Sequence, residues 1–84
     1  MLISGKVQGV WYRASAAEIA RELNLTGFAK NLNDGSVEIV AVGEKTQLEQ
    51  LRKWCEDGPS GAKVQDMRAE WSDTEEHFES FSIL

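Results

Sequence analysis

Cysteine, histidine and proline are almost absent from this sequence, which has one of each in 84 residues. The lone Cys55 allows no internal disulfide bond and no cysteine pair for a metal or redox centre, which fits a reducing, cytoplasmic setting. The lone His77 has no second histidine for a metal site or a catalytic dyad. We interpret Cys55 as a small core residue, and His77 as a partly exposed residue of the last strand.

Long hydrophobic runs and a surplus of positive charge are also missing. The most apolar run, Ile-Val-Ala-Val at 39–42, is far too short to span a bilayer, and the N-terminal segment does not have the pattern of a secretory signal. Lys and Arg number 9 against 14 Asp and Glu, and the resulting net charge of -5 argues against a broad surface for nucleic acid. We therefore expect a cytoplasmic protein with neither a membrane nor a nucleic acid as partner.

Repeats, low-complexity tracts and linkers are absent too, and the charges are scattered along the chain rather than grouped in blocks. A chain of 84 residues can form one modest hydrophobic core but not two. We expect a single domain over residues 1–84, and nothing in the sequence requires more than a monomer.

Hydrophobic spacing and turn residues divide the chain into strands and helices. Strands are predicted at 1–7, 26–32, 36–42 and 62–71 and in the last segment, 77–84. Asp34-Gly35 is typical of the tight turn in a hairpin that joins the second and third strands. Met67 is out of step with the strand period, which predicts that the fourth strand is bulged or twisted.

Two helices are predicted between these strands. The first ends near Asn24, a residue that tolerates a left-handed stop, and its apolar residues at helical spacing are Ala14, Ala17, Ala20 and Leu23 or Leu25. The second starts at a capping box from Thr46 to Glu49 and ends at Gly58-Pro59. Its apolar stripe consists of Leu48, Leu51, Trp54 and Cys55.

The order of these elements is strand, helix, strand, strand, helix, strand, with a closing strand at the C-terminus. This order is typical of the α+β class with a ferredoxin-like, split βαβ fold, in which two helices cover one face of a mainly antiparallel sheet. The fold class alone does not indicate a function, because many unrelated activities use it.

The segment between the first strand and the first helix contains the glycines Gly5 and Gly9, followed by Arg13. A strand, a tight loop and a helix N-terminus can together bind an anion, because main-chain N–H groups converge there. Arg13 could add two parallel hydrogen bonds to two phosphate oxygens. An ordinary turn followed by a solvent-exposed arginine is an equally good interpretation of these residues alone.

Asn31 is a second candidate, because asparagine is unfavourable in a strand that otherwise contains good strand formers. Its carboxamide oxygen could accept a hydrogen bond from a water molecule and hold it for attack. On the residues alone, a role in turning the chain toward Asp34-Gly35 is the favoured alternative.

Two segments, Gly-Lys-Val-Gln-Gly-Val-Trp-Tyr-Arg at 5–13 and the run from 27 to 43, together resemble the paired signatures of the acylphosphatase family. The resemblance covers essentially the whole chain. It implies a ferredoxin-like enzyme that cleaves the carboxyl–phosphate bond of small acyl phosphates to carboxylate and inorganic phosphate, without a metal or cofactor. It also implies that Arg13 grips the phosphate and Asn31 positions the water, and that phosphate-binding main-chain N–H groups come from Gln8, Gly9, Val10, Trp11 and Tyr12.

The sequence departs from the family pattern in two places. Tyr12 stands where the family usually has phenylalanine, so a hydroxyl needs a partner if the ring is buried. Four residues precede Gly5, fewer than usual, which is expected to shorten the first strand.

Two alternative functions remain. One is a phosphate-binding module without turnover, similar to the acylphosphatase-like domain of hydrogenase maturation factors; the absence of zinc-finger cysteines here favours an enzyme. The other is RNA binding, which the shared element order allows. The lack of paired aromatic residues in the 36–42 strand and the net charge of -5 argue against it.

Overall fold

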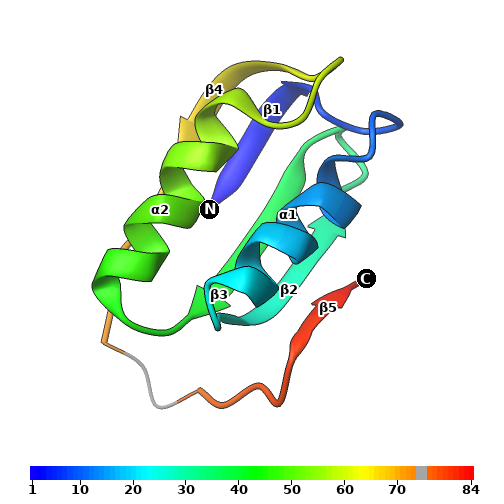
Figure 1. Cartoon of the computed structure of the whole chain (residues 1–84). Helices are drawn as coiled ribbons and strands as arrows, with labels where there is room; N and C mark the ends of the chain where they lie inside the picture. Colours follow the sequence, from blue (N-terminus) through cyan, green and yellow to red (C-terminus); the bar gives the residue numbers. More distant parts are fainter. Residues whose placement is uncertain (74–75) are drawn as a thin grey trace.

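In residues 1–73 and 76–84, which this computed structural model describes, two helices cover one face of a five-stranded sheet (Figure 1). The helices are α1 (Tyr12–Glu22) and α2 (Lys45–Asp57), and neither is long and apolar enough to cross a membrane. The strands are β1 (Leu2–Lys6), β2 (Thr26–Asn31), β3 (Val37–Val42), β4 (Lys63–Arg68) and β5 (Phe81–Ile83). They lie in the order β4-β1-β3-β2-β5, and β5 pairs with β2 in parallel while the other pairs are antiparallel. The predicted split βαβ arrangement is confirmed.

Helix α1 packs small side chains against the sheet. Its buried residues are Tyr12, Ala16, Ala17 and Ala20. Of the alanines at the predicted helical spacing, Ala17 and Ala20 are buried, whereas Ala14 is half-buried and lines a surface cavity. The physical reason is that the buried Tyr12 sets the phase of the helix, and residues 16 and 20 follow it by about one and two turns.

Helix α2 has the predicted apolar stripe but not the predicted start. Leu51 and Cys55 are fully buried, whereas Leu48 and Trp54 are partly buried against the core. The capping box at Thr46 is wrong: the helix begins at Lys45 after Glu44, no side chain caps it, and the Thr46 hydroxyl donates to the neighbouring Gln47 side chain at 2.9 Å.

Both helices end where the sequence predicts. Asn24 has a φ of 59° just after α1, and Gly58 has a φ of 68° just after α2. The Gly58 N–H donates to the Trp54 carbonyl at 2.8 Å, and Pro59 follows it. These residues are suited to the left-handed region or, in the case of proline, cannot continue a helix.

The predicted hairpin joins β2 and β3. Asn31, the last residue of β2, pairs with Val37, the first residue of β3. The Asp34 carboxylate accepts a hydrogen bond from the Ser36 N–H at 2.9 Å and another from the Ser36 hydroxyl, and these bonds lower the pKa of Asp34. The turn is therefore held by a side chain that reaches its own main chain two residues on.

The bulge in β4 is confirmed, but both late strands are shorter than predicted. Ser4 pairs with Asp66 and Gly5 with Val64, so Gln65 is the extra residue. Strand β4 ends at Arg68 rather than near residue 71, and β5 begins only at Phe81. His77 is accordingly an exposed residue outside the strands, and its assignment to the last strand is wrong.

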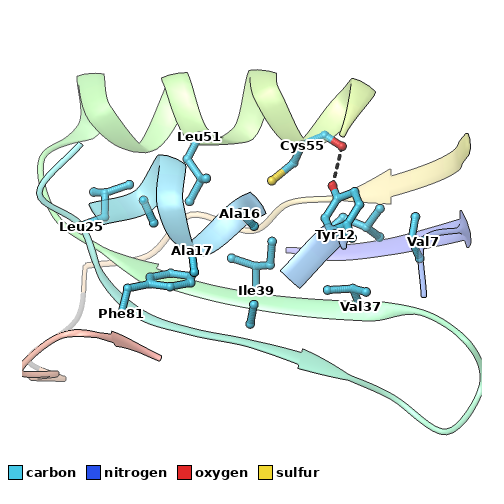
Figure 2. Close-up of a cluster of buried hydrophobic side chains, with 13 residues drawn as sticks. Val7, Tyr12, Ala16, Ala17, Leu25, Val37, Ile39, Leu51, Cys55 and Phe81 are labelled. Atoms are coloured by element: carbon cyan, nitrogen blue, oxygen red, sulfur yellow. Dashed lines mark hydrogen bonds between the residues drawn. The ribbon is translucent and has the colours of Figure 1, made fainter. Parts of the chain in front are cut away.

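The core lies between the helices and the sheet and is closed by a hydrogen bond between helix ends (Figure 2). The buried Tyr12 hydroxyl donates to the main-chain oxygen of Cys55 at 2.6 Å, which gives this hydroxyl the partner that its burial requires. In a helix that oxygen would accept from the N–H four residues later, but that residue is Pro59, which has no N–H. Tyr12 therefore takes the place of a missing helical donor.

Burial also explains the role of Cys55. It raises the pKa of the Cys55 thiol to about 11, so the thiol stays neutral at physiological pH. With no exposed surface and a neutral thiol, Cys55 is a packing residue, as predicted.

Replacing Tyr12 with phenylalanine should remove the donor to the Cys55 carbonyl. We expect the free energy of unfolding to fall by about 1–3 kcal/mol, the cost of leaving a buried acceptor without its partner, as measured by urea denaturation. Thr46→Ala is the control, because a side chain that does not cap α2 should change stability by no more than about 0.5 kcal/mol. Equal midpoints for Tyr12→Phe and the parent would contradict this account.

Gly27 lies in β2 with no room for a side chain beside β3. Its φ is 135°, and an added Cβ would lie 1.9 Å from the Val40 carbonyl oxygen. We expect Gly27→Ala to destabilise the fold by about 3 kcal/mol or more, measured by thermal and urea unfolding. Gly35→Ala is the matched control, since Gly35 has a φ of 93° but no atom within 4 Å of the added Cβ. Similar losses in both variants would show that the contact with β3 is unimportant.

Candidate functional site

The loop between β1 and α1 has the main-chain conformation of an anion-binding turn. Gly9 and Trp11 have φ values of 74° and 65°, so two residues of the left-handed region flank Val10. Alternation of this kind curves the chain and lets successive N–H groups point into one concave space. Val7 is buried at the start of the loop and Val10 packs against the core, which anchors the turn from beneath.

The first turn of α1 adds further N–H groups to this loop. The first helical hydrogen bond runs from the Ser15 N–H to the Trp11 carbonyl, and no side chain caps the helix. The N–H groups of residues 12–14 precede that bond and have no acceptor within the helix. Together with the positive end of the helix dipole, they favour a bound anion.

The Gln8 side chain braces the loop instead of facing a ligand. Its Nε2 atom donates to the Leu32 carbonyl at 2.8 Å and to the Ser36 carbonyl at 2.9 Å. These two bonds join the loop to the turn that follows Asn31. Sequence reasoning missed this role, because no local pattern indicates which main-chain atoms a glutamine will reach 24 and 28 residues away.

The structure brings most of the predicted residues together in one open cavity of about 430 Å³. Its volume lies within the range of roughly 300–1,000 Å³ that is usual for ligand pockets. It is lined by Val7, Gln8, Gly9, Trp11, Tyr12, Arg13, Ala14, Asn31 and Ile83. Val10 is not part of the lining, and the Tyr12 side chain points into the core, so these two residues can contribute only their main chains.

Arg13 lies in the first turn of α1 and reaches the end of the chain. Its Nη1 atom donates to the main-chain oxygen of Leu84 in a short hydrogen bond. Sequence reasoning missed Ile83 and Leu84 as site residues. They reach the site because β5 pairs in parallel with β2, with Ala29 opposite Ile83, which brings the ends of both strands to the same edge of the sheet.

Asn31 is the last residue of β2 and one of the residues that line the cavity. Its Oδ1 is buried and has no hydrogen-bond partner in the part of the chain that the structure describes. Buried acceptors are nearly always paired, and an unpaired one costs about 1–3 kcal/mol. An acceptor in this state is suited to a donor that arrives from outside, such as a water molecule.

The loop with the start of α1, the Arg13 side chain and the Asn31 side chain differ in what they can bind. The loop and helix N–H groups and the Arg13 guanidinium are donors, whereas the Asn31 oxygen is an acceptor on the neighbouring strand. Donors of this kind bind an oxyanion, and an acceptor beside it can hold a water molecule. The arrangement is suited to hydrolysis of a phosphorylated small molecule.

Comparisons with known proteins agree with this chemistry. The family model described as Acylphosphatase matches residues 1–83. An acylphosphatase from Marinobacter nauticus is 52% identical over 81 residues, which cover 96% of this chain and 88% of that protein.

Solved structures match as well. An acylphosphatase from Coxiella burnetii superposes with a TM-score of 0.93 at 41% identity, covering 99% of this chain and 86% of that one. Full-length HypF in a phosphate- and nucleotide-bound form gives a TM-score of 0.87 at 27% identity, with 99% of this chain but 11% of that one covered. Since both the family model and relatives of similar length match nearly every residue, this chain belongs to the acylphosphatase family and is an enzyme of this class.

Proposed function

We propose that this acylphosphatase binds the phosphoryl group of a small acyl phosphate with Arg13 and the main-chain N–H groups of residues 8–12. Asn31 holds the attacking water, and the products are a carboxylate and inorganic phosphate. The observation that carries this proposal is the meeting, in one cavity, of the unpaired Asn31 oxygen with Arg13 and the uncapped start of α1.

The reaction needs few groups because its leaving group is already stable. The water oxygen forms a bond to phosphorus while the bond from phosphorus to the acyl oxygen breaks, and the electron pair leaves with the carboxylate. The proton of the water passes to a phosphate oxygen of the substrate. In the loose transition state, charge is spread over the phosphoryl oxygens, so positioning and charge stabilisation are the main tasks of the protein.

Arg13 and the loop perform the stabilising task. A guanidinium has five N–H donors in a planar fork, and the bond to the Leu84 oxygen uses one of them and fixes the side chain beside the loop. The remaining donors can bind two phosphoryl oxygens in parallel. The N–H groups of the loop are held in place before the substrate arrives, so little reorganisation accompanies the reaction.

Asn31 performs the positioning task. Strand β2 holds its side chain next to the phosphate-binding loop, and the Gln8 bridge keeps the two segments together. A water that donates to the Asn31 oxygen is directed from the strand side toward the phosphoryl group. The neutral carboxamide accepts the hydrogen bond without repelling the phosphate. A negatively charged carboxylate in its place would repel the phosphate.

A phosphate-binding module without turnover is the second candidate, favoured by the similarity to HypF. That similarity covers 11% of the HypF chain, whereas 88% of the Marinobacter nauticus acylphosphatase is covered. The correspondence in length supports the enzyme.

The same proposal includes the domain organisation, the oligomeric state, the cellular location and the cofactor requirement of the protein. The chain forms a single domain over residues 1–84, works as a monomer in the cytoplasm, and uses neither a metal nor another cofactor. The match of one family model to residues 1–83 supports the single domain. The net charge of -5 argues against a nucleic-acid partner.

Removal of the Arg13 side chain tests the binding role. In an assay with benzoyl phosphate and EDTA, we expect Arg13→Ala to lower kcat/KM by on the order of 10² to 10³ or more, because a contact aimed at the transferring group is lost. Arg13→Lys should recover little, since an ammonium cannot form two parallel bonds. Arg52→Ala is the control, as Arg52 pairs with Glu56 on α2. Full turnover by folded Arg13→Ala would refute the role, and a folded parent that binds phosphate without turnover would favour the binding module.

Replacement of Asn31 by alanine should separate catalysis from stability. We expect kcat to fall by on the order of 10² to 10³, since the water loses its acceptor. The inhibition constant of inorganic phosphate should change much less. The free energy of unfolding should stay the same or rise by about 1 kcal/mol, because the substitution removes an unpaired buried acceptor. Asn33→Ala, in the exposed turn nearby, is the control; a stability loss without a loss of kcat would assign Asn31 a purely structural role.

A further inference from the structure

Three large apolar side chains with exposed surface lie at the candidate site, namely Trp11, Ile83 and Leu84, with exposed fractions of 80%, 44% and 59%. The other two in the part of the chain that the structure describes, Leu2 and Trp71, do not line this cavity. Trp11 and Ile83 line the cavity, and Leu84 binds Arg13 through its main chain. The mouth of the site is therefore apolar on a protein whose surface is otherwise rich in charge.

The main chain of Trp11 has a conformation that is unfavourable for a tryptophan. Its φ of 65° and ψ of 22° lie in the left-handed region, which bulky residues rarely adopt. Glycine or asparagine would occupy this position with less strain. The neighbours Val10 and Tyr12 turn inward to the core, so the indole is directed outward over the cavity. Backbone strain at an exposed aromatic residue of a binding loop points to a role of that residue in ligand binding.

The cavity has two chemically different sides. Arg13, Asn31 and the loop N–H groups provide the polar side, which takes the phosphoryl group in the proposed function. Trp11, Ala14 and Ile83 provide the apolar side. An acyl phosphate has the same division, with a charged phosphate at one end and a carbon chain or ring at the other.

We propose that Trp11 and Ile83 form the subsite for the acyl group, and that this subsite makes the enzyme prefer flat, apolar acyl groups such as benzoyl over acetyl. The inference rests on the proposed function. A benzoyl ring can lie against the indole face or edge while its phosphate remains on Arg13, and such aromatic pairs are favourable beyond the area that they bury. While its phosphate is bound by Arg13 and the loop, an acetyl group is too small to make as much contact with the indole as a benzoyl ring does.

The test compares two substrates in the same protein. We expect the ratio of kcat/KM for benzoyl phosphate to that for acetyl phosphate to fall roughly five- to tenfold in Trp11→Ala, the range expected from loss of one aromatic contact. Trp11→Phe should keep most of the ratio, because a flat ring remains. Trp11→Gly should lower it as Trp11→Ala does, and glycine adopts the left-handed conformation without strain, so this variant carries the test if the alanine variant does not fold.

The control is Trp71→Ala, a tryptophan that is exposed to 49% and does not line this cavity. Its substrate ratio should equal that of the parent. An unchanged ratio in folded Trp11→Gly, or an equal fall in Trp71→Ala, would overturn the acyl subsite. A parent that hydrolyses neither substrate would instead refute the proposed function, so the two failures are distinguishable.

Discussion

One side-chain amide, that of Gln8, ties the loop before α1 to the turn that follows Asn31. Its two hydrogen bonds, to the Leu32 and Ser36 carbonyls, cross between segments that are far apart in the sequence. This bridge adds to the sheet pairing and core contacts that set the separation between the donors of the loop and the acceptor on β2. Catalysis by positioning needs such a separation before the substrate arrives, because ordering the groups at the moment of reaction would raise the barrier.

Several unfavourable features of this small fold lie where the ligand is expected. Trp11 has a left-handed backbone, the buried oxygen of Asn31 has no partner among the described residues, and the first turn of α1 has no side-chain cap. Each of these lowers stability, and in the proposed function a charged substrate and a water supply the partners that α1 and Asn31 lack. The rest of the core compensates with complete burial and with the Tyr12 bond to Cys55.

The charge of the protein and the charge of its site differ in sign. The chain has a net charge of -5, yet the cavity presents a guanidinium and several converging N–H groups. Local donors act over a few ångströms and are screened little, whereas the scattered surface charges act through water and salt. In the proposed function, this difference lets an acidic protein bind a small anion while disfavouring long polyanions, and the proposed acyl subsite at Trp11 adds a preference among small anions.

The sequence by itself determined the order of the elements, the hairpin at Asp34-Gly35 and the helix stop at Gly58-Pro59, because these depend on neighbouring residues. The resemblance to acylphosphatases pointed to Arg13 and Asn31, which the structure places in one cavity. Only the tertiary structure decided that Gln8 braces the loop and that the end of the chain reaches Arg13. Those contacts come from the parallel pairing of β5 with β2 and from side-chain directions within a packed core, and such long-range choices have no signature in a local pattern.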